Sequence, residues 1–101
     1  MIKHLVMWQF NENLSLDERK NVAIKLKNDI EALQGQIPGI VSLKVVIDAL
    51  PTSNRDILLD SAFTSVEALA AYQIHPLHQA VAAYLGTVAD NRACLDYVDG
   101  K

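Results

Sequence analysis

The sequence predicts an α+β fold with the element order strand, helix, strand, strand, helix, strand. Three observations predict it: apolar residues alternate along several short segments, they recur every three or four residues along others, and glycine or proline punctuates the boundaries. The chain has 101 residues, 50% of them hydrophobic, which is enough for one modest core. We therefore expect a single domain over residues 1–101.

The first strand is predicted over Ile2 to Phe10, where His4 and Trp8 share one face. The other face carries Leu5 and Met7 and is also largely apolar. A strand with a solvent-facing side normally shows polar residues there, so this strand is expected to lie centrally, with something packed on each face.

The first helix is predicted to begin after Ser15, because Ser15 and Glu18 fit a capping box. Apolar residues at three- and four-residue spacing then indicate an amphipathic helix that packs on a sheet. The helix is expected to stop near Gln34, since Gly35 suits the position just past a helix end and Pro38-Gly39 forbids continuation.

Three further strands are predicted. Two of them, Val41 to Ile47 and Ile57 to Phe63, are joined by the polar turn Asp48 to Arg55. The last strand is expected at about Ala93 to Val98.

The second helical segment contains the run Tyr72 to His78, which places a phenol and two imidazoles around a proline. Ser65 can cap the helix that leads into this run. Proline disfavours the helical conformation for His75, so the helix should end or kink there. Pro76 suits the first position of a new short helix, which we expect Gly86 to end.

Right-handed crossovers give this element order one common solution, the ferredoxin-like fold, a four-stranded antiparallel sheet with its helices on one face. The opposite sheet face would then expose apolar residues of the first two strands, which is unusual for a soluble monomer. Burying that face against a second copy would contribute several kcal/mol at about 25 cal/mol per Å². We therefore expect a homodimer whose sheets pack face to face.

Composition excludes several functional classes. The net charge of −3 comes from scattered residues without a basic run, so nucleic acid is not an expected partner. No apolar stretch is long enough to span a membrane, and the first ten residues alternate like a strand, so we expect a cytoplasmic protein without membrane contact. The single cysteine, Cys94, is expected to be a small packing residue.

No cofactor or metal is expected. The sequence lacks a Gly-rich phosphate loop, a nucleophile elbow and a cysteine pair. A metal site built from His4, His75 and His78 is conceivable, but these residues lack a typical ligand spacing.

Several stretches make the chain resemble the stress-responsive A/B barrel (Dabb) family of the dimeric α+β barrel proteins. They are the opening Ile2 to Val6 with Trp8 and Phe10, the turn Ile37 to Ile40, the segment Phe63 to Leu69 running on to Tyr72, His75-Pro76 and His78, and the ending Leu95 to Tyr97. The resemblance covers nearly the whole chain and implies the dimeric barrel and a link to stress response. It implies no single function, because the family includes plant stress proteins, a polyketide cyclase and bacterial members without an assigned activity.

In that cyclase, the position matching His78 removes a proton for an aldol closure, and the position matching Tyr72 positions the substrate. The family's first-strand histidine matches His4. The cyclase has a pocket histidine on the third strand where this chain has Ile57, so a different substrate or no catalysis is implied here.

The residues themselves favour the same candidates. His78 is predicted in the first turn of a helix, where the positive end of the helix dipole disfavours an imidazolium and leaves a neutral general base. Tyr72 and His78 are therefore the candidate catalytic residues, with Tyr72 as the hydrogen-bond donor. His4, Trp8 and His75 are candidate binding residues, although His75 is the weaker one because its place before proline already explains it.

Two classes of function remain open. The protein could bind a small, largely apolar carbonyl or aromatic compound in a pocket between sheet and helices. It could instead be a cofactor-free acid/base enzyme, polyketide-cyclase-like or oxygenase-like. A cavity of ~300 Å³ or more that Tyr72 and His78 face would favour binding or chemistry, whereas sealed side chains would indicate a structural role.

Overall fold

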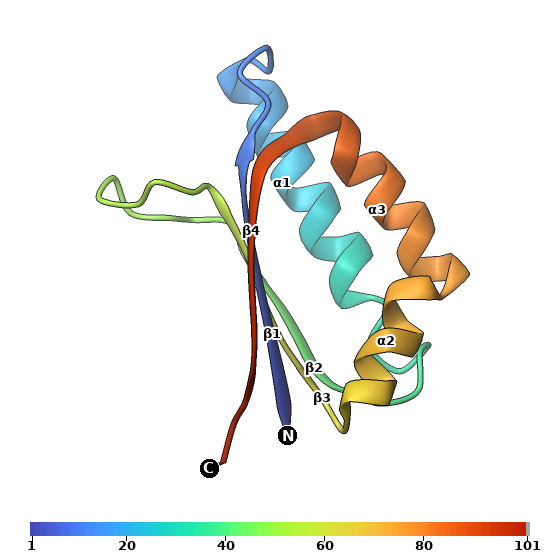
Figure 1. Ribbon diagram of the computed structural model, residues 1–101. Coiled ribbons are helices and arrows are strands. Elements are labelled where there is room, and N and C mark those ends of the chain that lie inside the picture. The colour runs from blue at the N-terminus through green and yellow to red at the C-terminus, as the bar shows by residue number, and fades with distance from the viewer. Residues whose placement is uncertain (101) are drawn as a thin grey trace.

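The computed structural model describes residues 1–100, which form one antiparallel sheet with three helices on one of its faces (Figure 1). Along the chain the elements are β1 (Ile2–Phe10), α1 (Leu16–Glu31), β2 (Ile40–Val46), β3 (Ile57–Phe63), α2 (Val66–Ile74), α3 (Pro76–Val88) and β4 (Ala89–Val98). Across the sheet the order is β2-β3-β1-β4, and every neighbouring pair is antiparallel. The predicted ferredoxin-like arrangement is confirmed, with β1 in a central position.

The start of α1 is as predicted, but its end is not. The Ser15 hydroxyl accepts from the Glu18 amide at 3.1 Å, and the Glu18 carboxylate accepts from the Ser15 amide at 2.9 Å. The helix ends at Glu31 instead of near Gln34, because the following residues form tighter turns. The side chain of Gln34 instead donates to the Val41 carbonyl and accepts from the Leu43 amide, both on the edge strand β2.

The break before Pro76 is confirmed. His75 is extended, with φ −67° and ψ 135°, and its imidazole Nδ1 accepts from the Leu77 amide at 3.1 Å. Pro76 is the first residue of α3, where a missing amide hydrogen leaves no helical bond unmade.

Two predicted boundaries near the C-terminus are wrong. Gly86 does not end α3, which continues to Val88 because Gly86 keeps a negative φ. The last strand begins at Ala89, four residues before the predicted Ala93, and no loop separates it from α3. The early part of β4 escaped the alternation pattern because it contains a bulge, at which Asn91 adopts a left-handed φ of 54°. β2 is also shifted by one residue at each end relative to the prediction.

The core lies between the sheet and the helices. Its largest fully buried side chains include Tyr72, Phe63, Leu26 and Ile57. The opposite sheet face has no covering layer in the single chain, and there Leu95 is 62% exposed. Among residues 1–100, no helix is both long enough and apolar enough to cross a membrane.

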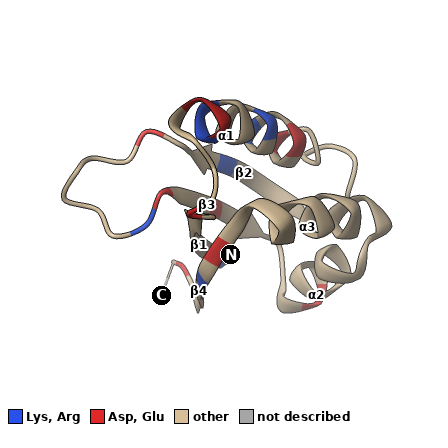
Figure 2. Cartoon of the chain, turned by 90° about the horizontal axis from the view of Figure 1, so that it is seen from above, with Lys and Arg blue, Asp and Glu red and all other residues tan. Residues whose placement is uncertain are grey.

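Charge is unevenly distributed over the helical layer. Seen from above, α1 carries both basic and acidic side chains, whereas α3 carries neither (Figure 2). Salt bridges of the i, i+4 kind join Lys25 to Asp29 and Lys27 to Glu31 on α1. A charged group that contacts α3 from the helical layer is Lys25 of α1, whose Nζ lies 4.8 Å from the centroid of the Tyr84 ring.

Gly39 offers a test of how the turn before β2 packs. Its φ is +89°, and a Cβ there would lie 2.5 Å from the Ala68 Cβ on α2. Gly39→Ala should therefore combine left-handed strain with overpacking and reduce the free energy of unfolding by roughly 2–4 kcal/mol in urea titrations.

Gly35→Ala is the matched control. Gly35 has a similar φ of +88° but open space where the Cβ would stand. Gly35→Ala should therefore reduce the free energy of unfolding only by the cost of a left-handed alanine, about 1–2 kcal/mol. Equal losses of unfolding free energy in the two variants would show that α2 accommodates the methyl group added at position 39 without a packing cost.

Candidate functional site

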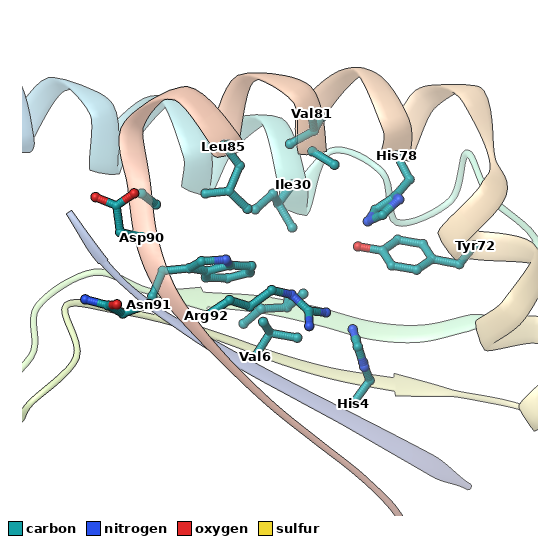
Figure 3. A pocket seen from close by; sticks show the side chains of 15 residues that line it. His4, Val6, Ile30, Tyr72, His78, Val81, Leu85, Asp90, Asn91 and Arg92 are labelled. Atoms are coloured by element: carbon teal, nitrogen blue, oxygen red, sulfur yellow. The ribbon is translucent and has the colours of Figure 1, made fainter. Parts of the chain in front are cut away.

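A cavity of about 370 Å³ lies between the sheet and α3 (Figure 3). This volume passes the threshold set above for a binding pocket. Most of its wall is apolar and is built by Val6, Trp8, Ile30, Leu59, Val81 and Leu85. Polar groups enter from both ends of this wall, with His4, Tyr72 and His78 on one side and Asp90 and Asn91 on the other, while the Arg92 side chain lies between them and points toward His4 and Tyr72 (Figure 3).

Tyr72 is only 1% exposed, yet its hydroxyl has no hydrogen-bond partner among the described residues. No fully buried side-chain nitrogen or oxygen lacks a partner in residues 1–100, so the hydroxyl must be open to the cavity. Its ring packs against Phe63 at a centroid distance of 4.9 Å. Burial raises the pKa of Tyr72 to about 12, so near neutral pH it is a phenol that can donate a hydrogen bond.

His78 presents one free ring nitrogen. Its Nδ1 lies 3.1 Å from the carbonyl oxygen of Gln73. A carbonyl only accepts, so Nδ1 carries the proton and the neutral ring keeps its lone pair on Nε2. The imidazole and the Tyr72 ring are 4.3 Å apart between centroids, and both point into the cavity in Figure 3.

The pKa of His78 is lowered from its ordinary value, and burial is the largest cause. The hydrogen bond to Gln73 opposes this shift, while electrostatic interactions with His4, Arg92 and His75 add to it. The lowered pKa of His78 agrees with the neutral base expected from the sequence. That expectation, however, is based on the position of His78 at the positive end of a helix dipole. Burial under the helical layer is the stronger reason.

His4 forms the sheet side of the site. It is 3% exposed on β1, and its Nδ1 is hydrogen-bonded to the carboxylate of Asp96, the residue opposite it on β4. Because the carboxylate accepts, Nδ1 donates and Nε2 is left free in the neutral ring. The backbone carbonyl of His4 accepts from the Ser61 hydroxyl at 2.6 Å, which fixes this residue from the other neighbouring strand.

The structure brings together four of the five residues that the sequence singled out. His4, Trp8, Tyr72 and His78 all line the cavity. His75 does not, since its ring caps α3 and faces the break instead.

The sequence argument missed four polar residues in or beside the site, namely Asp90, Asn91, Arg92 and Asp96. Asp96 could have been found only from the β1–β4 register, which sets it opposite His4. Arg92 was hidden by the bulge, because the extra residue there disturbs the alternation that assigns side chains to faces.

Three groups with metal-ligand chemistry meet beside the cavity. The ligand atoms of His4, Cys94 and Asp96 lie within 4.8 Å of one another. Cys94 is exposed, contrary to the packing role expected for it, and partial burial together with Asp96 raises the pKa of its thiol. In residues 1–100 this trio is the group that could hold a metal, although the His4 Nδ1 proton is already shared with Asp96.

Comparison with known proteins identifies related chains. The family model described as the stress responsive A/B barrel domain matches residues 2–99. A dimeric protein of unknown function and ferredoxin-like fold from Bacteroides fragilis is 30% identical, with 95% of this chain and 93% of that chain covered and a TM-score of 0.88. None of the curated proteins matches this sequence.

More distant structures share the fold. A Dabb family protein from Mesorhizobium loti is 19% identical, with 99% of this chain and 97% of that chain covered and a TM-score of 0.75. The hydroxynitrile lyase from Passiflora edulis is also 19% identical, with 99% and 94% covered and a TM-score of 0.77. At this identity the likeness establishes the fold alone.

The half-buried position of His78 predicts the direction in which its pKa is shifted. By NMR, its ring should titrate below the model value of about 6.5. Since the unfolded chain then binds a proton at higher pH than the folded chain, His78 should make stability fall as pH drops below about 6.5. His78→Gln should lose this part of the pH dependence in urea titrations, and a measured pKa at or above the model value would contradict the site as described.

Proposed function

The chain belongs to the stress responsive A/B barrel (Dabb) family, and we propose that it binds a small, largely apolar carbonyl or aromatic compound in the cavity beneath α3. The observation that carries this proposal is the Tyr72 hydroxyl, which sits on a buried side chain, opens into the cavity and has no protein partner among residues 1–100. A ligand carbonyl that accepts from this hydroxyl would gain a hydrogen bond with a net worth of about 0.5–1.5 kcal/mol.

The rest of the cavity suits such a ligand. Its wall combines aliphatic side chains with the indole of Trp8, so a flat or branched apolar body is desolvated on entry. Tyr72 supplies a donor, and Nε2 of His78 supplies an acceptor a short distance from it. A small number of polar groups in an apolar cavity is enough to fix the orientation of a ligand, and the ligand itself can remain largely apolar.

Acid/base catalysis without a cofactor is the second candidate, and the tautomer of His78 favours it. With Nδ1 protonated toward Gln73, Nε2 can remove a proton from a carbon next to a ligand carbonyl. Tyr72 would hydrogen-bond to the enolate oxygen that then forms, and its pKa of about 12 keeps it protonated for this role. The oxygenase-like reading rests on fold analogy alone.

We also infer a homodimer through the open sheet face. Leu5 and Leu95 lie opposite each other there, and Tyr97 on the same face is 42% exposed. The β2–β3 loop extends from the sheet away from the helices, on the side where a partner would pack (Figure 1). The Bacteroides fragilis relative is described as dimeric. Stress response and a cytoplasmic location stay predictions.

Ligand binding can be tested with two simple probes. Acetophenone carries the carbonyl, and ethylbenzene has nearly the same shape without it. In wild-type protein, both should shift the NMR signals of the cavity residues, with acetophenone binding more tightly. Tyr72→Phe should weaken acetophenone about 5- to 10-fold, the worth of one hydrogen bond, and leave ethylbenzene unchanged.

The same samples separate binding from catalysis. In D₂O, a general base in contact with acetophenone should speed deuterium exchange of its methyl protons. His78→Gln should abolish the acceleration, and Glu67→Gln should keep it, because Glu67 is exposed on α2 and does not line the cavity. Binding without accelerated exchange would support the binding function alone, and no binding of either probe would refute both candidates.

Leu95→Glu tests the dimer. A buried, unpaired carboxylate at the centre of the sheet contact should convert the dimer to a monomer in light scattering at micromolar concentration. Ile24→Glu is the control, since Ile24 is 54% exposed on α1 in the helical layer and should leave the mass unchanged. A wild-type monomer at this concentration would contradict the proposed interface.

A further inference from the structure

We propose that the ligand of this cavity carries a carboxylate, and that Arg92 binds it. This inference rests on the proposed binding function and narrows the ligand class to small apolar carboxylic acids, aromatic or aliphatic. The proposal follows from the charge at the cavity, from the way the backbone presents Arg92, and from the shape of the surrounding wall.

Among residues 1–100, no carboxylate forms an ion pair with Arg92. Figure 3 shows its side chain entering the cavity near Val6. The guanidinium of Arg92 is always charged. The helix above it contributes no charge, so among residues 1–100 the fully charged groups in the cavity wall are Asp90 and Arg92, both from β4 (Figure 2).

The backbone is shaped to present this side chain. On β1, Met7 pairs with Ala93 and Gln9 pairs with Asp90, so Trp8 alone stands opposite two residues of β4. The extra residue forms a β-bulge, a device that often redirects a side chain beside a functional site. Arg92 thereby lines the cavity together with Trp8, while part of its side chain stays exposed to solvent at the edge strand.

Side chains from two other segments hold the bulge. Asn91 takes a left-handed conformation, which costs a non-glycine residue roughly 1 kcal/mol. Its amide donates to the side-chain oxygen of Gln9, and its carbonyl accepts from Nε of Arg55 at 2.9 Å. Gln9 in turn donates to the Asn54 carbonyl at 2.9 Å. Residues outside β4 thus hold the bulge that sets Arg92 opposite Trp8 at the cavity.

The arrangement favours a carboxylate over a phosphate. A planar carboxylate can accept two parallel hydrogen bonds from one guanidinium. One cation balances its single charge, whereas a doubly charged phosphate would leave an excess negative charge near Asp90 in the same wall. The apolar body of the acid would lie against Trp8 and Leu85, with its reactive end toward Tyr72 and His78.

Matched probes test the inference separately from the proposed function. 4-Acetylbenzoate carries the carboxylate, and 4-acetylbenzamide has the same shape without the charge. In NMR titrations at pH 7.5 and low salt, wild-type protein should bind the benzoate about 10-fold more tightly than the benzamide. Arg92→Gln should remove this preference while leaving benzamide binding unchanged, which also shows that the cavity stays intact.

Two further variants make the result specific. Arg92→Lys should keep part of the preference, because the charge remains but the paired geometry is lost. Arg19→Gln should keep all of it, because Arg19 lies on α1 and does not line the cavity.

Each contrary outcome has a distinct meaning. Equal binding of the two probes by wild-type protein would refute the carboxylate inference and leave the binding function standing. A preference that survives Arg92→Gln would exclude Arg92 as its source. Tighter binding of 4-acetylphenyl phosphate than of the benzoate would overturn the choice of carboxylate, and failure of every probe to bind would refute the proposed function itself.

Discussion

The constraint on which the site depends is the peptide bond between His75 and Pro76. In an unbroken helix, two residues six positions apart are separated by about 9 Å along the axis and point in different directions. Tyr72 and His78 are six apart, yet their rings lie 4.3 Å from each other. Proline forces the change of direction, and the imidazole of His75 satisfies the Leu77 amide that the break leaves free. The phenol and the imidazole face one cavity because the helix is divided there.

On the sheet side of the cavity, His4 is held in a fixed position by hydrogen bonds. His4 lies on the central strand β1, so both of its neighbours can act on it: Ser61 binds its carbonyl from β3, and Asp96 binds its ring from β4. A histidine restrained on both sides loses little further freedom when a ligand arrives. The cavity therefore has a rigid floor, and its polar groups come from strands far apart in the sequence.

Periodicity and local chemistry predicted the elements, because those signals are carried by neighbouring residues. The capping box of Ser15 and the break at Pro76 are both of this kind. Gly86 misled the prediction because glycine ends a helix only when it takes a positive φ, and the direct passage into β4 made such a turn unnecessary. Tyr72 and His78 were recognisable from their own motif, whereas Asp96 and Arg92 reach the site through strand register and a bulge, which no local pattern encodes.

The passage from α3 to β4 has a mechanical consequence. Val88 ends the helix and Ala89 begins the strand, so no loop residue can absorb a displacement of one relative to the other. His78 lies on α3, and Leu95 lies on β4, the strand that follows α3 directly. The side chain of Leu95 is on the sheet face opposite the helices. A ligand that draws α3 toward the sheet must therefore strain β4 as well. The helix over the cavity and the strand that borders the open sheet face are thus one continuous segment, Pro76 to Val98.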